Sequence, residues 1–252
     1  MTFPSPLIGI LGGMGPRAGL DLAEKLIGLT RAQNDQDHIP FILFSLPEMV
    51  SDRTAFLLGR QETNPAYAIA EQFEKMSSLG CTIAAMACNT AHAGPIFDVA
   101  LELLRKKGIE LRILNMVQET VTHIQKTGRH IRRVGILGTH GTYQTGLYDR
   151  ALEAAGLEAI LPASGYREDI HDAIYCIKEG SGPVAEATAG RIHAAIQHLI
   201  GLGAGAVILG CTELPLAVRN EQIDGIQILD PTRIIAEKLI RETWPDKLVI
   251  AD

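Results

Sequence analysis

An internal repeat constrains the fold of this 252-residue chain more than any other feature. The stretch IGILGG near the N-terminus returns as VGILGT in the second half, and each is a short apolar run ending in a glycine turn. Arg53 and Lys178, and likewise Cys88 and Cys211, lie nearly the same distance apart, about 125 residues. A glycine turn, a cation and a cysteine therefore recur in the same order. The repeat predicts two similar domains that each contribute one thiol and one cation.

The pattern of apolar residues predicts the α/β fold class, with parallel sheets flanked by helices. Apolar runs alternate with longer stretches of helical period, as in sheets covered on both faces. Strands are expected at 7–11, 40–46, 82–87, 111–115, 133–138, 158–161, 206–210 and 226–229. Helices are expected at 16–33, 64–79, 94–107, 117–126, 143–155, 167–180, 184–201 and 231–243.

We expect two pseudo-symmetric domains with the active site in the cleft between them. The first would comprise residues 1–114 and 225–252, because the last strand and helix are expected to return to it. The second would comprise residues 115–224. In parallel α/β sheets the ligand crevice lies at the carboxyl ends of the strands, so site residues are sought there.

Composition excludes several classes of partner. A net charge of −6 argues against nucleic acid or an anionic membrane as the main partner. A basic, apolar leader is not recognisable, and no apolar run approaches the roughly 18 residues that span a bilayer, so a cytoplasmic location is predicted. The four cysteines show neither disulfide nor zinc spacing. Two of them, Cys81 and Cys176, are expected to be buried as small apolar residues.

The other two cysteines each end a buried strand. Polar residues follow them directly, Asn89 and Thr90 after Cys88 and Thr212 after Cys211, and could hold a carboxylate. The N-terminus of a following helix would lower the pKa of each thiol. Two acid/base groups on opposite faces of one substrate are what inversion at a carbon centre requires.

The two glycine turns suggest carboxylate binding. The turn at 12–16 lacks the third glycine of a dinucleotide fingerprint, and the next strand begins only near residue 40. A backbone cradle for a small carboxylate fits better. The matching turn at 138–142 adds the hydroxyls of Thr139 and Thr142.

Charged and polar residues near these turns complete the predicted site. Lone cations such as Arg53 and Lys178 are often solvated surface groups, and their matched positions make a role in the site an equal alternative. His92 is expected to support the turn at Cys88. Glu213 is expected to orient the loop at Cys211 or to cap the next helix. No metal spacing or convincing cofactor motif is present, so neither a metal nor a cofactor is expected.

These motifs together resemble those of the aspartate/glutamate racemase superfamily, which does not use pyridoxal phosphate, and most closely its aspartate-racemase branch. The matching segments cover nearly the whole chain: GGMGP at 12–16, DRT at 52–54, CNTAH at 88–92, GILGTHGT at 135–142, IKEG at 177–180 and GCTELP at 210–215. Two departures are Ala87 and Asn115, where many relatives have proline and histidine. The resemblance implies a homodimer of two-domain subunits.

The resemblance also implies roles for individual residues. Cys88 and Cys211 match the two catalytic cysteines, with Cys211 deprotonating the L-isomer and Cys88 the D-isomer. Arg53 and Lys178 match cations that hold substrate carboxylates, and further positions line the substrate: Met14, Asn89, Thr90 and Thr212. The implied reaction is cofactor-independent interconversion of L- and D-aspartate, extending to glutamate.

Rival functions are a related carbanion enzyme, such as a maleate isomerase or hydantoin racemase, and a small-acid-binding protein without catalysis. The two cations favour a diacid over a hydantoin, and the presence of both cysteines favours catalysis.

Overall fold

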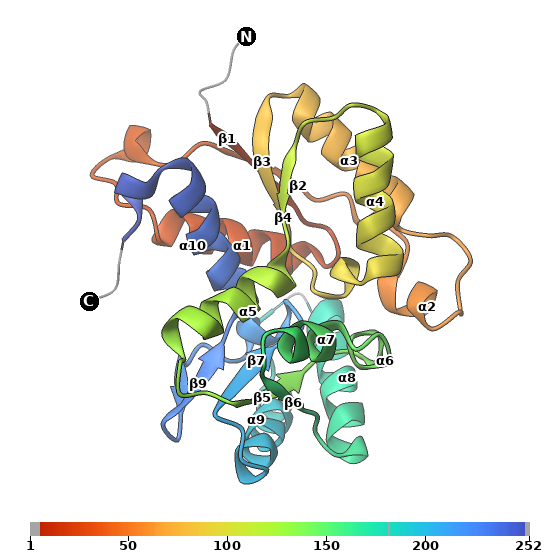
Figure 1. The fold of residues 1–252 in the computed structure, drawn as a ribbon, viewed down its shortest axis with the longest axis vertical. Helices are drawn as coiled ribbons and strands as arrows, with labels where there is room; N and C mark the ends of the chain where they lie inside the picture. The colour runs from red at the N-terminus through yellow and green to blue at the C-terminus, as the bar shows by residue number, and fades with distance from the viewer. Residues whose placement is uncertain (1–5, 181, 250–252) are drawn as a thin grey trace. The chain divides into compact units, whose positions relative to one another are not determined.

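The computed structural model describes residues 6–180 and 182–249; the expected first domain thus has its ends, 1–5 and 250–252, outside the described residues. All eight expected strands are present, and the two sheets confirm the α/β class (Figure 1). The strands are β1 (Leu7–Leu11), β2 (Phe41–Phe44), β3 (Cys81–Met86), β4 (Arg112–Leu114), β5 (Arg133–Leu137), β6 (Glu158–Ile160), β7 (Ala206–Leu209), β8 (Gln222–Ile223) and β9 (Ile226–Leu229).

Helices fill the gaps between strands, close to the expected ranges. They are α1 (Pro16–Gly28), α2 (Arg53–Leu57), α3 (Ala66–Ser78), α4 (Gly94–Lys106), α5 (Met116–Thr127), α6 (His140–Gln144), α7 (Leu147–Ala154), α8 (Ser164–Glu179), α9 (Glu186–Gly201) and α10 (Pro231–Thr243). The single helix expected over 143–155 is wrong: two helices lie there, because Gly146 adopts a left-handed conformation with φ of 54°. The short helix α2 was not expected.

The two sheets repeat one topology. The first has the order β2-β1-β3-β4 and the second the order β6-β5-β7-β9-β8. In both, the opening strand pairs in parallel with the next two strands of its half. β1 therefore corresponds to β5, and β3 corresponds to β7. The duplication seen in the sequence extends to the order of the strands.

The last strand corrects the expected domain boundary. β9 pairs in parallel with β7, so residues 226–229 belong to the second sheet and not to the first domain. Asp224 and Gly225, with φ of 49° and 77°, form the tight turn that pairs β8 antiparallel with β9. One compact unit extends to Met116 and resumes at Thr232, and the intervening residues form the other. Of the last strand and helix, only α10 belongs to the same unit as the N-terminal residues.

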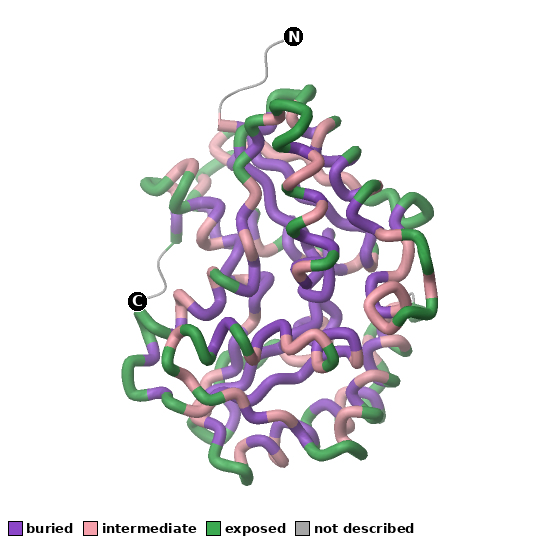
Figure 2. The backbone as a smooth tube through the Cα atoms, turned by 45° about the vertical axis from the view of Figure 1, so that its right-hand side comes forward, coloured by how far each residue is buried: buried purple, intermediate pink, exposed green. Residues whose placement is uncertain are grey.

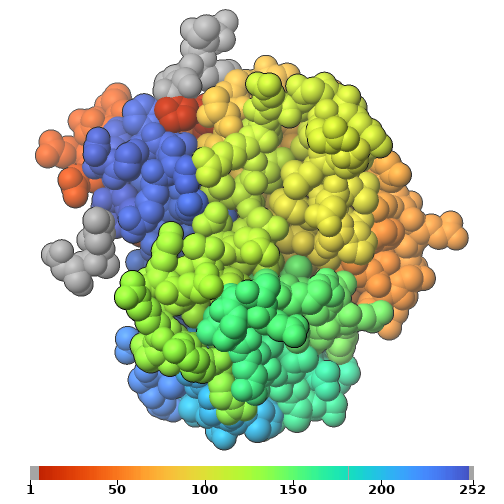
Figure 3. Space-filling model, viewed as in Figure 1, coloured from red at the N-terminus to blue at the C-terminus, as the bar shows by residue number. Residues whose placement is uncertain are grey.

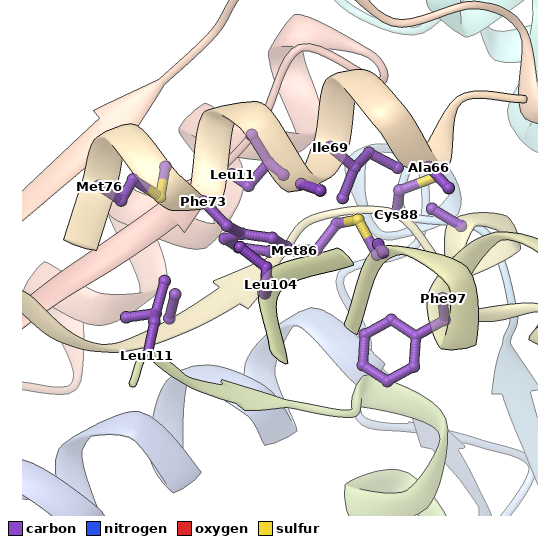
Figure 4. Close-up of a cluster of buried hydrophobic side chains, with 14 of the residues drawn as sticks. Leu11, Ala66, Ile69, Phe73, Met76, Met86, Cys88, Phe97, Leu104 and Leu111 are labelled. Carbon is purple, nitrogen blue, oxygen red and sulfur yellow. The ribbon is translucent and has the colours of Figure 1, made fainter. Parts of the chain in front are cut away.

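The first sheet is covered on both faces. Leu7 and Leu11 face a core completed by α3 and α4, part of which Figure 4 shows. Ile8 and Ile10 face a second core completed by α1 and α10. The strands accordingly appear mostly as buried segments in Figure 2, whereas the outer side of α4 forms surface, in yellow, in Figure 3.

In the second unit, one face of the sheet packs against α8 and α9. Ile170, Ile174 and Ile177 of α8 lie fully within this core. Because these residues are spaced by four and three, they lie on one side of α8, and that side faces the sheet. The adjacent side of the helix does not face the sheet. In the part of the chain that the structure describes, no helix is both long and apolar enough to cross a bilayer.

Candidate active site

Cys88 lies two residues beyond the end of β3 and is 5% exposed. Its N–H donates to the carbonyl oxygen of Met86 at 2.9 Å, which closes a tight turn after the strand. Its side chain joins the first core of this unit, near Ala66 at the start of α3 (Figure 4). The next element is a single 3-10 turn at Thr90–His92, and α4 begins only at Gly94.

His92 lies beneath the turn that carries Cys88. Its Nδ1 is 2.8 Å from the carbonyl oxygen of Cys88, and because a carbonyl can only accept, Nδ1 carries the proton. Burial lowers the pKa of His92 to about 4, so the ring is neutral at physiological pH. The ring also packs against Phe97, with 4.9 Å between centroids. His92 thus contacts the backbone of Cys88, as expected of a supporting residue.

Arg53 is held by backbone carbonyl groups. It opens α2, whose N-cap is Asp52, and it is 8% exposed. Its Nη2 donates to the carbonyl oxygen of Met14 at 2.8 Å, and its Nη1 donates to that of Ser51 at 3.1 Å. These bonds join the segment around Arg53 to the first glycine turn. The structure therefore brings together two predicted site residues, Arg53 and Met14.

The glycines of the first turn are required by close backbone contacts. A Cβ at Gly12 would lie 3.0 Å from the Cα of Gly19 in α1. Gly13 has φ of 83°, and a Cβ there would lie 2.9 Å from the backbone nitrogen of Leu46. Packing alone explains both glycines, and the backbone cradle for a carboxylate stays a prediction.

Cys211 occupies the equivalent place in the second sheet, two residues beyond β7, and is also 5% exposed. Its thiol donates to Oε2 of Glu213 at 3.0 Å, and the hydroxyl of Thr212 donates to the same oxygen at 3.4 Å. Glu213 is 2% exposed, and its Oε1 has no hydrogen-bond partner among the described residues. A carboxylate therefore lies directly against the second thiol.

The environment of Cys211 raises its pKa well above the ordinary value. Burial is the largest cause, and the negative charge of Glu213 adds to it, while the positive charge of Lys178 acts in the opposite direction. The expected lowering by a helix N-terminus is wrong for this thiol, because a 3-10 turn at Leu214–Leu216 follows it and a carboxylate contacts it. Burial and the carboxylate both favour the protonated form of Cys211.

Lys178 lies in the last turn of α8. Its Nζ is 4.8 Å from the centre of the Tyr175 ring, and its charge lowers the pKa of Cys211. Both residues belong to the second unit, where the charge of Lys178 acts on Cys211. Tyr175 was not expected at the site. Its spacing of three residues from Lys178 on a helix was the sequence signal for this contact.

The second glycine turn is held by hydroxyl groups. Thr139 and Thr142 are both buried, and the N–H of Thr142 donates to Oγ1 of Thr139 at 3.3 Å, which caps α6. The two hydroxyl oxygens are 3.2 Å apart. The N–H of Gly138 donates to the hydroxyl of Tyr143 at 2.9 Å, so a side chain uses one of the backbone donors expected to bind substrate.

The remaining predicted residues lie close to their cysteines in the chain, and the other two cysteines differ from one another. Asn89 and Thr90 are buried beside Cys88. Cys81 is buried as expected, and burial raises its pKa to about 11. Cys176 is exposed, which corrects the expectation that it packs in a core, because it lies on the outer side of α8. Over residues 6–180 and 182–249, no group of three or more His, Cys, Asp or Glu side chains could hold a metal.

Comparisons with known proteins agree with the fold. The model of the Asp/Glu/Hydantoin racemase family matches residues 11–239. The broad specificity amino-acid racemase RacX of Bacillus subtilis is 25% identical over 240 residues, covering 93% of this chain and 96% of that protein. The Picrophilus torridus aspartate racemase is 28% identical and superposes with a TM-score of 0.80 over 94% of each chain.

Glutamate racemase isoform RacE1 from Bacillus anthracis has a TM-score of 0.64 at 16% identity, covering 95% of this chain and 83% of that one, a likeness of fold. The family match spans most of the chain, including both cysteine-bearing strand ends and both glycine turns. The chain belongs to the Asp/Glu/hydantoin racemase family.

Proposed function

We propose that this protein interconverts L- and D-aspartate, and glutamate as a second substrate, by a cofactor-independent mechanism in which Cys88 and Cys211 act as the two acid/base groups. One observation carries this proposal. Each thiol lies two residues beyond the corresponding strand, β3 or β7, and the order β2-β1-β3-β4 of the first sheet matches β6-β5-β7-β9 of the second. A homodimeric, cytoplasmic enzyme stays a prediction.

The proposed chemistry assigns complementary protonation states to the two thiols. The α-proton of an amino acid is very weakly acidic, so one cysteine must be a thiolate while the other donates a proton to the opposite face of the carbon. Such acid/base groups contribute typically 10²–10⁴-fold to the rate. The raised pKa of Cys211 supports its role as the initial proton donor. In that direction Cys88 removes the proton of the D-isomer and Cys211 forms the L-isomer.

The residues around the thiols supply the remaining stabilisation. As the α-carbon loses its proton, negative charge develops on the carboxylate next to it. Cations and N–H groups fixed before the reaction stabilise that charge without having to reorganise. Lys178 is suited to this task because its charge already acts at Cys211. Arg53 is suited to it because backbone carbonyls fix its guanidinium.

Two cations favour a substrate with two carboxylates. A monoacid would offer a carboxylate to one of the two cations only, whereas a substrate with two carboxylates can interact with both. The aspartate racemase of Picrophilus torridus supports this substrate, whereas the name of the Bacillus subtilis relative describes a broad specificity. A broad-specificity racemase is therefore the second candidate.

Solvent exchange distinguishes these candidates. Protein incubated with L-aspartate in D₂O, without added pyridoxal phosphate, is expected to yield D-aspartate with deuterium at the α-carbon. L-Glutamate is expected to react more slowly and L-alanine hardly at all. Chiral chromatography with mass spectrometry gives both readouts. Equal turnover of alanine and aspartate would establish the broad-specificity alternative, and a requirement for pyridoxal phosphate would eliminate the two-thiol mechanism.

Variants of the two cations test the preference for a diacid. Arg53→Ala and Lys178→Ala are each expected to lower kcat/KM for aspartate at least about tenfold, which corresponds to roughly 1.4 kcal/mol of transition-state stabilisation. Arg53→Lys is also expected to be impaired, since an ammonium cannot replace a planar guanidinium with several donors. Steady-state racemisation of aspartate and alanine by each variant is the measurement. Unchanged activity of both alanine variants on aspartate would contradict the diacid assignment.

A further inference from the structure

One side of α8 carries a row of stacked side chains that leads to Lys178. The ring of His140, the first residue of α6, lies 3.9 Å from the ring of His171, centroid to centroid. The ring of His171 lies 4.7 Å from that of Tyr175, and Nζ of Lys178 lies 4.8 Å from the Tyr175 ring. Residues 171, 175 and 178 are neighbours on a helix surface because they are spaced by four and three.

We propose that Tyr175 is a positioning residue that restrains the ammonium group of Lys178, and that the stacked rings of His140 and His171 brace Tyr175 against the turn carrying Thr139. The inference rests on the proposed function and deepens it, since it explains how one of the two cations for substrate carboxylates is fixed.

An aromatic partner restrains a lysine side chain at this position. Its ammonium is a point charge on a flexible four-carbon stem, unlike the guanidinium of Arg53, which backbone carbonyls hold. The face of an aromatic ring attracts a cation electrostatically, so the Tyr175 ring restricts where the ammonium lies. The restricted position is one from which the charge of Lys178 lowers the pKa of Cys211.

The far end of the stack is fixed to α6. The N–H of His140 donates to Nδ1 of His171 at 3.4 Å, a long bond that requires this nitrogen to be unprotonated. Burial and then the charge of His140 lower the pKa of His171, which keeps the middle ring neutral beside the lysine. Nε2 of His140 also contacts Oε2 of Glu168 at 3.1 Å, a second link from α6 to α8.

The same helix offers a matched control. Tyr166 stacks on His198 of α9 with 4.3 Å between ring centroids. This pair is also aromatic, is half-buried and joins α8 to a neighbouring helix. Loss of the Tyr166 ring should therefore reproduce any general loss of packing on α8 without releasing Lys178.

The experiment compares Tyr175→Leu, Tyr175→Met and Tyr175→Phe with Tyr166→Leu. Removing the Tyr175 ring is expected to raise KM for aspartate about fivefold, the factor by which a partly exposed cation–π contact restrains its cation. Tyr175→Phe keeps the ring and should remain within about twofold of wild type. Two ring-free variants are used so that one that fails to fold does not decide the result.

A second readout is independent of racemisation. The rate at which iodoacetamide alkylates Cys211, followed by peptide mass spectrometry as a function of pH, should show a pKa displaced upward in the ring-free variants. In a Lys178→Met background, Tyr175→Leu should change neither KM nor alkylation further.

Wild-type values for the folded ring-free variants in both assays, or an equal effect of Tyr166→Leu, would overturn the positioning role. If the wild type does not racemise aspartate, the proposed function fails, but the alkylation profiles still decide whether Tyr175 positions Lys178.

Discussion

The two cysteine-bearing strand ends share a backbone plan but differ in what surrounds the thiol. At Cys88 a neutral histidine donates a hydrogen bond to the backbone carbonyl oxygen of the cysteine. At Cys211 a buried carboxylate accepts a hydrogen bond from the thiol, and a lysine charge acts on it. The repeated topology therefore sets where each sulfur lies, while the neighbours set how readily Cys211 loses its proton.

The residues that precede the two cysteines also differ, because the space available for a Cβ differs. A Cβ at Gly210 would lie 2.7 Å from the carbonyl oxygen of Leu137, so only glycine fits there. At the equivalent position Ala87 is accommodated, and its N–H donates to the carbonyl oxygen of Leu11 at 2.8 Å. The two halves thus differ in how closely the neighbouring backbone approaches the residue before the cysteine.

The largest expected effect tests whether racemisation requires both thiols. Cys88→Ser and Cys211→Ser are each expected to lower racemisation of aspartate by about 10²–10⁴-fold, because every turnover uses one base and one acid. Chiral chromatography of initial rates in both directions is the measurement.

The other cysteines are the controls for this pair. Cys81→Ser should retain activity with some loss of stability, because it is buried in the first core, and exposed Cys176→Ser should behave as wild type. If Cys88→Ser alone remained near wild-type activity, only the second half would supply a catalytic thiol, and the two-base mechanism would be wrong.

A second prediction concerns the histidine that distinguishes the first half. The pKa of His92 is about 4 in the folded state and about 6.5 when unfolded. Between these values the unfolded chain binds a proton that the folded chain does not, so stability is present above pH 6.5 and falls as the pH is lowered. This linkage is expected to remove about 2 kcal/mol between pH 7 and pH 5.

Urea unfolding at several pH values measures this effect in the wild type and in His92→Gln. The variant should lack this component of the pH dependence, whatever its absolute stability, whereas His193→Gln on the exposed side of α9 should keep it. Parallel pH profiles for wild type and His92→Gln would show that His92 is not buried in its neutral form.

Much of this architecture can be predicted from the sequence because it depends on the local periodicity of apolar residues. The alternation of Leu7 with Ile8 along β1 marks both faces of a covered strand, and the ranges of α4 and α10 follow from their apolar spacing. The placement of both cysteines after strands follows from the same patterns. Their matching positions in the repeat then distinguish Cys88 and Cys211 from the other two cysteines of the chain.

What escaped prediction depends on contacts distant in sequence or on single backbone angles. The boundary at 224/225 coincides with a hairpin turn of Asp224 and Gly225, since aspartate followed by glycine signals a turn within a sheet as readily as an end of a domain. The raised pKa of Cys211 reflects burial that no local pattern reveals. The stack from His140 to Tyr175 joins two helices and needs their packing to be known.

The smallest expected effect sharpens the electrostatic contrast between the strand ends. Glu213→Gln removes the negative charge that, after burial, most raises the pKa of Cys211. Removing it lowers that pKa, so at pH 7 a larger fraction of Cys211 is thiolate. A thiolate of lower pKa is also intrinsically less nucleophilic, so the two effects partly cancel and we expect alkylation of Cys211 by iodoacetamide to accelerate only about threefold.

Peptide mass spectrometry of Cys88 and Cys211 in the same samples makes the comparison internal. The alkylation rate of Cys88 should be unchanged in Glu213→Gln, and Glu186→Gln on the exposed surface of α9 should change neither rate. Equal acceleration at both thiols would indicate a general loosening of the fold. Slower alkylation of Cys211 would mean that Glu213 assists loss of the thiol proton instead of opposing it, and the assignment of Cys211 as the initial donor would then be reversed.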